Sequence, residues 1–229
     1  MKQTKIDWCD STVNSVIGCK NGCPYCYAER LNKRFNFIPN WKEPQFFPER
    51  LKALESKTPK TIFMDSMSDV GHWKEEWGEP IRKAILNNPQ HAYIFLTKNL
   101  IFGSVIQPIR SEPNVFCGKS ITKQRDLWHL AEGYDFLSIE PLLEKIELPD
   151  FATKPALANL NSIIIGAETG NRKDKIIPKK EWVLSLVKYC NKRHIKVFMK
   201  ESLRELMGDD FRQDKLPWYE YLESETRRN

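Results

Sequence analysis

Three cysteines near the start of the chain have the spacing of a metal site that is one ligand short. Cys19, Cys23 and Cys26 form the pattern C-x3-C-x2-C, and Tyr25 directly precedes the last cysteine. A structural zinc ion takes four protein ligands, and an electron-transfer [4Fe-4S] cluster normally takes four cysteines. The triplet therefore predicts a [4Fe-4S] cluster whose fourth iron is open to a further ligand.

The other three cysteines are predicted to have roles different from those of the triplet. Cys9 lies ten residues before Cys19 and could close a four-cysteine zinc or iron-sulfur site, which would leave no open iron. Cys117 and Cys190 stand in apolar contexts, and we expect both in the core.

Length, charge and apolar runs place the chain among soluble globular proteins. A chain of 229 residues is long enough for one sizeable core, and we expect a single domain over residues 1–229. The net charge of +6 permits nucleic acid as a partner but does not indicate it, because the basic residues form no long stripe. The first residues lack a signal peptide and the longest aliphatic run is too short to span a bilayer, so we expect a cytoplasmic protein without membrane contact.

Short apolar runs alternate with amphipathic segments along the chain. The expected strands are 12–17, 61–65, 92–97, 114–118, 136–139, 162–166 and 195–199, and the expected helices are 24–34, 49–56, 80–87, 99–109, 122–131 and 179–192. Segments 35–48 and 142–160 are predicted to be long surface loops. The alternation predicts an α/β fold with a parallel sheet, most simply a partial parallel (β/α) barrel of six to seven strands, although an open doubly wound sheet has the same local pattern.

Polar and charged residues follow nearly every predicted strand. Ligands of parallel α/β proteins bind where the strands end, so these residues are the candidates for binding and catalysis. They are 65–69 after the second strand, Lys98 after the third, Ser120 after the fourth, Glu140 after the fifth, Gly166 with Glu168 after the sixth, and Lys200 after the seventh.

Around the cysteines the sequence resembles the radical S-adenosylmethionine (SAM) superfamily. Every position of that superfamily's motif is occupied in this chain, by Cys19, Cys23, Tyr25 and Cys26. The chain also resembles a phage- and prophage-associated family of radical-SAM-like proteins linked to three-Cys-motif partner proteins. The stretches that carry this second resemblance are KIDWCDSTVN, CYAERL, FMDSMSD, FLTK, LSIEPLL, IIIGAETG and VFMK. The chain departs from that family in a shorter loop between the first two cysteines and in Ala167, where a second glycine is common.

The resemblance implies a radical SAM enzyme that acts on an unknown substrate, which could be a nucleotide or nucleic acid. Its implied cofactors are a [4Fe-4S] cluster on the three cysteines and S-adenosyl-L-methionine on the fourth iron. Reductive cleavage of SAM would give a 5′-deoxyadenosyl radical that abstracts hydrogen from the substrate. The implied partners are an electron donor such as flavodoxin or ferredoxin and a three-Cys-motif partner protein.

The resemblance and the strand ends together give each candidate residue a role. Ser66, Ser68 and Asp69 are assigned to the methionine amine of SAM, Ser120 and Glu140 to its ribose hydroxyls, and Gly166 with Glu168 to its adenosine. Tyr25 is assigned to shielding the cluster. The candidate catalytic residues are Lys98, Glu140 and Lys200, and the two lysines are expected to contact an anionic substrate.

Two other classes of function remain open. One is the non-catalytic four-cysteine zinc or iron-sulfur protein that includes Cys9. The other is an enzyme of nucleic-acid repair or modification, similar to spore photoproduct lyase, in which Trp41, Trp73 and Trp77 could stack on bases.

Overall fold

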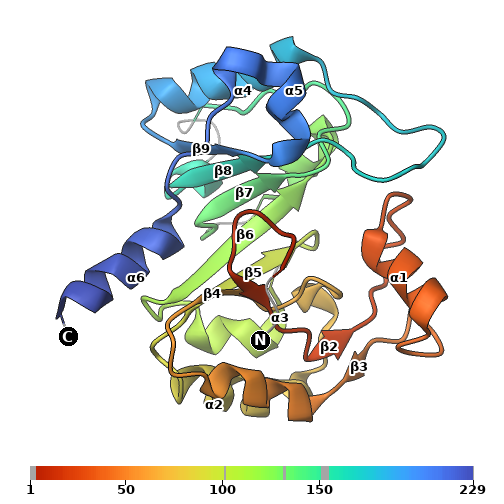
Figure 1. The fold of residues 1–229 in the computed structure, drawn as a ribbon, viewed down its shortest axis with the longest axis vertical. Coiled ribbons are helices and arrows are strands. Elements are labelled where there is room, and N and C mark those ends of the chain that lie inside the picture. The colour runs from red at the N-terminus through yellow and green to blue at the C-terminus, as the bar shows by residue number, and fades with distance from the viewer. Residues whose placement is uncertain (1–3, 101, 131–132, 151–154, 229) are drawn as a thin grey trace. The chain divides into compact units, whose positions relative to one another are not determined.

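The structure is a computed structural model that describes residues 4–100, 102–130, 133–150 and 155–228 (Figure 1). The chain divides into two compact units. The first consists of Met1–Phe116 and Trp218–Asn229, and the second of Cys117–Pro217. Each unit has its own set of parallel strands.

The sheet of the first unit contains β1 (Ser11–Thr12), β4 (Thr61–Phe63) and β5 (Ala92–Thr97). β4 lies between the other two and pairs with both in parallel. Every residue of β4 and all but one of β5 are buried. Burial on both faces is typical of a parallel sheet, and it explains why these segments are continuously apolar in the sequence.

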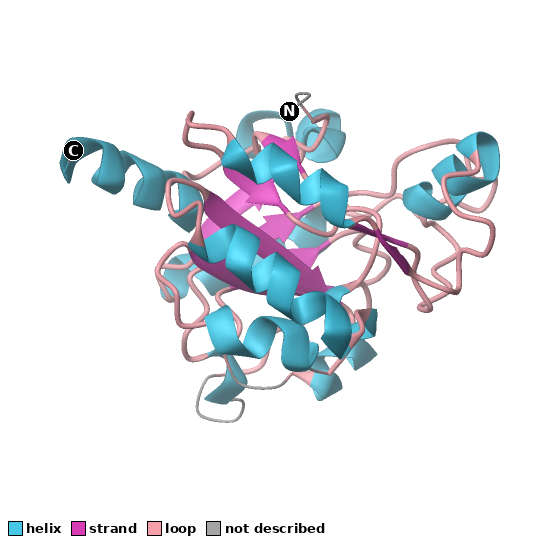
Figure 2. Cartoon of the chain, turned by 90° about the horizontal axis from the view of Figure 1, so that it is seen from below, coloured by secondary structure: helices cyan, strands magenta, loops and turns pink. Residues whose placement is uncertain are grey.

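A small antiparallel ribbon carries the segment that contains the cysteines. It pairs β2 (Val16–Ile17) with β3 (Gln45–Phe46), and α1 (Tyr27–Phe35) lies in the connection between them (Figure 2). The strand predicted at 12–17 is therefore two strands, because the chain leaves the main sheet at Asn14, whose side-chain oxygen accepts hydrogen bonds from Ser66 Oγ and the Met67 amide. The loop predicted at 35–48 was wrong in part, since β3 lies within it.

Helices and 3-10 turns connect the strands of the first unit. They are η1 (Pro48–Glu55), η2 (Val70–His72), η3 (Glu75–Trp77), α2 (Gly78–Leu86), α3 (Gly103–Ile106), η4 (Gln107–Ile109) and α6 (Pro217–Arg228). The helix predicted at 99–109 was too long. Gly103 has a positive φ of 71°, and Pro108 lacks an amide donor, so only α3 is α-helical there. Trp218 Nε1 donates to the Trp8 carbonyl at 2.9 Å, which fixes the C-terminal helix to this unit.

The second unit contains most of one parallel strand and three whole ones, in the order β6 (Val115–Ile121), β7 (Phe136–Ile139), β8 (Ser162–Ile165) and β9 (Lys196–Met199). β7 and β8 are buried throughout. The remaining elements are η5 (Gln124–His129), η6 (Pro155–Leu157), α4 (Lys180–Lys192), η7 (Glu201–Leu203), α5 (Arg204–Met207) and η8 (Gly208–Asp210).

Local hydrogen bonds explain where the helix predictions for this unit differ. At 122–131 the structure has the 3-10 helix η5, because Asp126 Oδ2 accepts from the backbone amides of Thr122 and Lys123 and tightens the turn. The end of that predicted helix, Ala131, lies outside the described residues. The helix predicted at 179–192 is confirmed as α4, whose buried face carries Val183, Leu186 and Cys190.

The predicted α/β class with parallel strands is therefore confirmed within each unit. Closure into a partial barrel and organisation as a single domain stay predictions. No helix in the described ranges combines the length and the apolar character that crossing a bilayer requires.

Candidate functional site

The cysteine loop starts at the carboxyl edge of the first unit's sheet. The Gly18 amide donates to the Met67 carbonyl at 3.0 Å, and the Cys19 amide donates to the Trp41 carbonyl at 2.9 Å. Gly18 has a φ of 112°, and a Cβ atom there would lie 2.8 Å from Pro44 Cα. Only glycine fits this conformation and this close approach, so the sequence fixes the backbone one residue before the first thiol.

Backbone amides point at two of the three sulfurs. Asn21 N lies 3.5 Å from Cys19 Sγ, and Glu29 N lies 3.4 Å from Cys26 Sγ. Cys26 is the N-cap residue of α1, where the helix dipole favours negative charge. Amide donors of this kind stabilise thiolates and tune the potential of an iron-sulfur cluster.

Two of the three thiols hold their protons more tightly than an ordinary cysteine does. Burial, together with the carboxylate of Asp69 and the thiols of Cys23 and Cys26, raises the pKa of Cys19 to about 12, although the Asn21 amide lowers it. Burial also raises the pKa of Cys26. A metal that binds here must therefore displace protons.

Asp69 is the residue that joins the cysteine loop to the sheet. Its buried carboxylate accepts five hydrogen bonds, and the donors are Asn21 Nδ2 (2.7 Å), Gly71 N (2.9 Å), Thr97 Oγ1 (2.7 Å), Lys98 N (2.8 Å) and Asn99 Nδ2 (2.9 Å). Two carboxylate oxygens have about four lone-pair sites, and this set fills them. Asp69 therefore holds the cysteine loop against the sheet, and its assignment to the SAM amine stays a prediction that requires one of these donors to be displaced.

A cation lies beside Tyr25 and Cys23 of the cysteine loop. Lys98 Nζ is 5.6 Å from the centre of the Tyr25 ring. Burial lowers the pKa of Lys98, but Tyr25, Cys23 and Asp69 together outweigh burial and raise the pKa above its ordinary value. Lys98 is therefore a fixed positive charge next to the thiols, a position suited to balancing the charge of thiolate ligands.

His72 is a functional candidate that sequence reasoning missed. Its Nδ1 lies 3.7 Å from Cys19 Sγ and 3.2 Å from the Lys20 amide. Burial lowers the pKa of His72, so the imidazole is neutral, which is the form that binds metal. His72 ends η2, only three residues after Asp69 in the loop that follows β4. The presence of a histidine in the loop after β4 was the feature of the sequence that could have indicated this role.

The neighbouring Asp65 carries a buried carboxylic acid. Its side chain is almost fully buried, and burial, followed by the charge of Asp69, raises its pKa well above the ordinary value. Oδ1 accepts a long bond of 3.4 Å from the Leu96 amide, while Oδ2 has no hydrogen-bond partner among the described residues. Asp65 therefore holds its proton more tightly than an ordinary aspartic acid does.

The two serines of this loop that were predicted to bind SAM form hydrogen bonds within the protein. Ser66 Oγ donates to Asn14 Oδ1 at 2.9 Å, and Ser68 Oγ accepts from Trp73 Nε1 at 2.9 Å. Ser68 therefore keeps a hydroxyl proton that it can donate, and Ser66 keeps lone pairs that can accept. Trp73, once considered for base stacking, is buried instead.

The other three cysteines lie outside the cysteine loop. Cys9 is buried just before β1, at the amino edge of the sheet, where the Asp10 amide donates to the Thr61 carbonyl. The triplet lies at the carboxyl edge of the same sheet. Cys117 and Cys190 are buried in β6 and α4 of the second unit, as expected for core residues.

The second unit brings three predicted residues together at the ends of its strands. Lys200 Nζ forms an ion pair with Glu140 Oε1. Gly166 lies against this pair, since a Cβ atom there would be 2.9 Å from Lys200 Cδ and 3.2 Å from Glu140 Cγ. The ends of β7, β8 and β9 thus form one compact cluster, although Glu140 and Lys200, predicted to contact ligands, contact each other in this state.

Glu168 and Ser120 lie elsewhere in that unit. Glu168 is buried, and its two oxygens accept from Arg172 Nε at 2.6 Å and Nη2 at 2.8 Å. This bidentate pair holds the loop after β8, so positioning explains Glu168 without a ligand. Ser120 is half-buried in β6, paired in register with Ser138 of β7.

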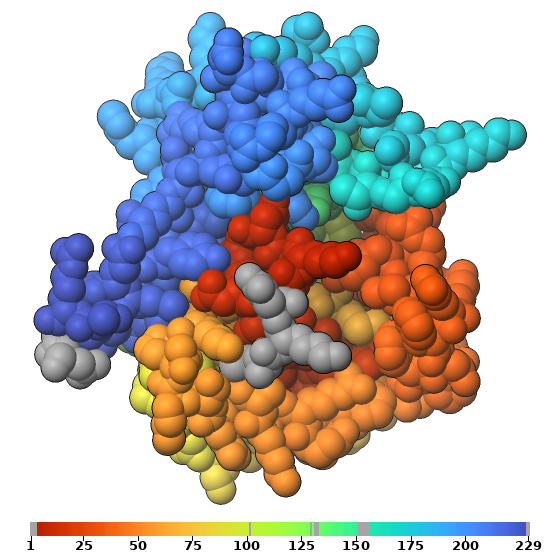
Figure 3. All heavy atoms as spheres, in the orientation of Figure 1, coloured from red at the N-terminus to blue at the C-terminus, as the bar shows by residue number. Residues whose placement is uncertain are grey.

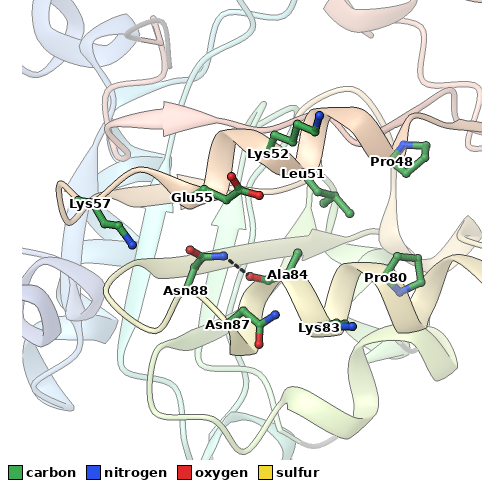
Figure 4. A pocket seen from close by; sticks show the side chains of 10 residues that line it. All are labelled: Pro48, Leu51, Lys52, Glu55, Lys57, Pro80, Lys83, Ala84, Asn87 and Asn88. Atoms are coloured by element: carbon green, nitrogen blue, oxygen red, sulfur yellow. Dashed lines mark hydrogen bonds between the residues drawn. The ribbon is translucent and has the colours of Figure 1, made fainter.

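A surface groove of about 570 Å³ lies away from the cysteines, between η1 and α2 (Figure 4). Its lining combines three lysines and one glutamate with amide and apolar side chains: Pro48, Leu51, Lys52, Glu55, Lys57, Pro80, Lys83, Ala84, Asn87 and Asn88. None of these residues was predicted to bind or react.

A comparison with protein families gives one match, "Protein of unknown function (DUF5131)", over residues 3–210. The chain belongs to the DUF5131 family. No curated protein and no solved structure matches it. The resemblances to the radical SAM superfamily and to the phage- and prophage-associated radical-SAM-like family were wrong as family assignments, because the family found is DUF5131 and no radical SAM model matches.

The function of this DUF5131 protein must therefore be argued from its own residues. Among the residues that the structure describes, no three His, Cys, Asp or Glu side chains are arranged closely enough to hold a metal ion as they stand. The chemistry of the donors around the loop is what fits a metal: three thiols, two amides directed at sulfur, a helix N-terminus and the Lys98 cation.

Proposed function

We propose that Cys19, Cys23 and Cys26 bind three irons of a [4Fe-4S] cluster and that its fourth iron binds S-adenosylmethionine. When bound, such a cluster would supply the electron that cleaves SAM to a 5′-deoxyadenosyl radical, which abstracts hydrogen from a substrate. The observation that carries the proposal is the set of three thiols at a sheet edge from which Cys9 is separated. The proposal rests on these residues and on no family assignment.

The residues around the loop have distinct proposed roles. Asp69 holds the loop at Asn21, while Lys98 balances negative charge on the sulfurs. Tyr25, with the Lys98 cation on its ring, shields the sulfurs from water. Ser66 can accept from the amine of SAM and Ser68 can donate to its carboxylate, because their hydroxyls keep those capacities.

The roles predicted for the second unit's residues from the sequence stay predictions. These are contacts to adenosine for Ser120, Glu140, Gly166 and Glu168, and contact with a substrate for Lys200. For Glu140 and Lys200 this requires that the ligand replace their mutual ion pair. The substrate class stays open, and nucleotide or nucleic acid is one candidate.

The decisive experiment is anaerobic reconstitution with iron and sulfide, followed by dithionite, SAM and chromatography for 5′-deoxyadenosine. The expected result is a brown protein that forms this product. Replacing Cys26 by Ser should abolish both the colour and the product. Cys9→Ala is the matched control and should keep both. A stable cluster that yields no 5′-deoxyadenosine would refute the catalytic proposal.

One observation favours a second candidate, a closed zinc site of three cysteines and His72. In a tetrahedral zinc site, sulfur and nitrogen ligands are about 3.5 Å apart, given bond lengths of about 2.3 and 2.0 Å. The observed distance from Cys19 Sγ to His72 Nδ1 is 3.7 Å. His72→Ala separates the candidates: it should release zinc from a closed site but leave a three-cysteine iron-sulfur cluster intact, as judged by metal content and absorbance.

A further inference from the structure

Helix α1 exposes an apolar ridge to solvent. Tyr27, Leu31 and Phe35 are spaced four residues apart and therefore lie on one face of the helix. Their exposed fractions are 46%, 36% and 54%, and that of Phe37, just beyond the helix, is 42%. We call these four residues the α1 ridge.

The ridge is an unusual concentration of exposed apolar area. The structure describes ten large hydrophobic residues as exposed, and four of them fall within 27–37. Single exposed apolar residues need no explanation, but a contiguous group marks an interaction site. The segment that carries the ridge, coloured red to orange, lies at the surface in Figure 3.

The ridge is held in place before any partner binds. Tyr27 Oη donates to the Ser66 carbonyl at 2.7 Å, and the Phe35 and Phe37 rings are 5.7 Å apart. The Arg34 guanidinium lies 5.0 Å from the Phe35 ring centre. Such ordering lowers the entropic cost of docking a partner.

The charges beside the ridge are mostly positive. Arg30, Lys33 and Arg34 lie on the same helix, and its single acid, Glu29, pairs with Lys33 at 3.0 Å. Aromatic side chains and arginines at the centre of a patch are typical of protein–protein interfaces. The charge complement of this rim is an acidic partner surface, which would also accelerate association.

The ridge begins next to the cysteines. Cys26 caps α1, so Tyr27 is its immediate neighbour, and a helix of nine residues extends only roughly 13 Å. A protein docked on the ridge would therefore lie close to any group held by the three thiols.

We propose that the α1 ridge docks an acidic one-electron donor protein. This inference rests on the proposed cluster function and names the partner of that site. In the step, the donor loses one electron and the group on the cysteines gains it, with no bond made or broken. Single-stranded nucleic acid is less well matched, because the ridge is a helix surface with an aliphatic residue, Leu31, at its centre rather than a basic groove.

The test uses the full-length reconstituted protein and two probes, an acidic flavodoxin and an acidic ferredoxin. The variants are Phe35→Ala and the double change Arg30→Glu with Arg34→Glu. The matched control is Lys52→Glu with Lys83→Glu, which makes the same change in charge at the groove between η1 and α2. Binding is measured by titration calorimetry at low and high salt.

We expect at least one probe to bind the unmodified protein, and both ridge variants to weaken that binding about tenfold or more. The control should stay within about twofold. Salt should weaken binding to the unmodified protein and have less effect on the charge-reversal variant. Iron content and reduction by dithionite should not differ between variants, which shows that the ridge variants are folded and loaded.

The outcomes separate this inference from the proposed function. If dithionite and SAM give no 5′-deoxyadenosine from loaded protein, the proposed function has failed. If they do give it, the inference alone is overturned by any of three results: neither probe binds, ridge and control variants bind equally well, or the ridge variants instead abolish self-association or binding of a single-stranded oligonucleotide.

Discussion

The side-chain amide of Asn21 donates a hydrogen bond to Asp69 Oδ2 at 2.7 Å, across 48 residues of sequence. Asn21 lies between the first two cysteines, and Asp69 lies in the loop after β4. The geometry of the sulfur ligands therefore depends on a carboxylate that is itself fixed by the end of β5, through Thr97 and Lys98.

Replacing Asp69 by Ala should destabilise the first unit by about 2–4 kcal/mol, because it leaves several donors without an acceptor. It should also weaken binding of cobalt(II), used as a spectroscopic probe of thiolate sites. Urea unfolding and a cobalt titration measure the two effects. Glu79→Ala is the control, since Glu79 is an exposed carboxylate that pairs with Arg82 at the surface. Equal behaviour of the two variants would contradict the role of Asp69.

Asn21→Ala separates the two functions of that hydrogen bond. It removes one of five donors from Asp69 and leaves the bonds to the sheet in place. We expect a loss of about 1 kcal/mol in unfolding free energy but a clear loss of cobalt affinity, because the loop is released while the sheet edge is not. A variant with reduced stability and unchanged cobalt affinity would show that the bond does not position the cysteines.

The sequence predicted the parallel strands and the polar strand ends because both follow from local pattern. Continuous apolar runs mark buried parallel strands, and the residues after them had to meet at one edge of each sheet. It did not predict the role of Asp69 or the proximity of His72 to Cys19. Those depend on which donors and acceptors from distant segments meet. A single sequence does not show whether the hydrogen-bonding capacity of a side chain is filled.

Substituting Gly18 by Ala should disturb the cysteine loop more than the rest of the unit. The positive φ and the contacts at 2.8–2.9 Å leave no room for a methyl group. We expect a loss of at least about 1–2 kcal/mol, together with weaker cobalt binding. Gly22→Ala is a matched control, because Gly22 has a positive φ of 66° but open space around its Cβ position. Its loss of stability should therefore come from the strained backbone conformation and not from crowding. Similar losses for both would mean that crowding at Gly18 is unimportant.

Asp65→Asn should stabilise the protein at neutral pH. The folded-state pKa of Asp65 is raised, so the folded protein binds its proton more tightly than the unfolded chain does. That contribution to stability is complete below about pH 4 and is lost as pH rises through the folded pKa. Asparagine cannot ionise, so the stability of the variant relative to the unmodified protein should rise as the pH rises from 4 to 8. Unfolding titrations over this range check the prediction, and an unchanged difference at all pH values would contradict it.

Metal affinity of the cysteine loop should rise with pH. The pKa of Cys19 is about 12 and that of Cys26 is also raised, so thiol protons must leave when a metal binds. Cadmium titrations followed by thiolate absorbance between pH 6 and 8 should show progressively tighter binding. Proton release measured in weakly buffered solution gives an independent check. Binding that is independent of pH would mean that the thiols are not the ligands.

The Glu140–Lys200 ion pair should show a measurable coupling energy. Its side chains are only 27% and 16% exposed, so solvent screens their attraction less than at the surface. In a double-mutant cycle with Glu140→Gln and Lys200→Met, we expect a coupling of about 1–2 kcal/mol in unfolding free energy that persists in high salt. The exposed pair Lys145–Glu147 in the same unit is the control and should show no measurable coupling. A ligand that replaces the ion pair must overcome this coupling energy in order to bind either residue. Zero coupling would mean that Glu140 and Lys200 are available to a ligand at no energetic cost.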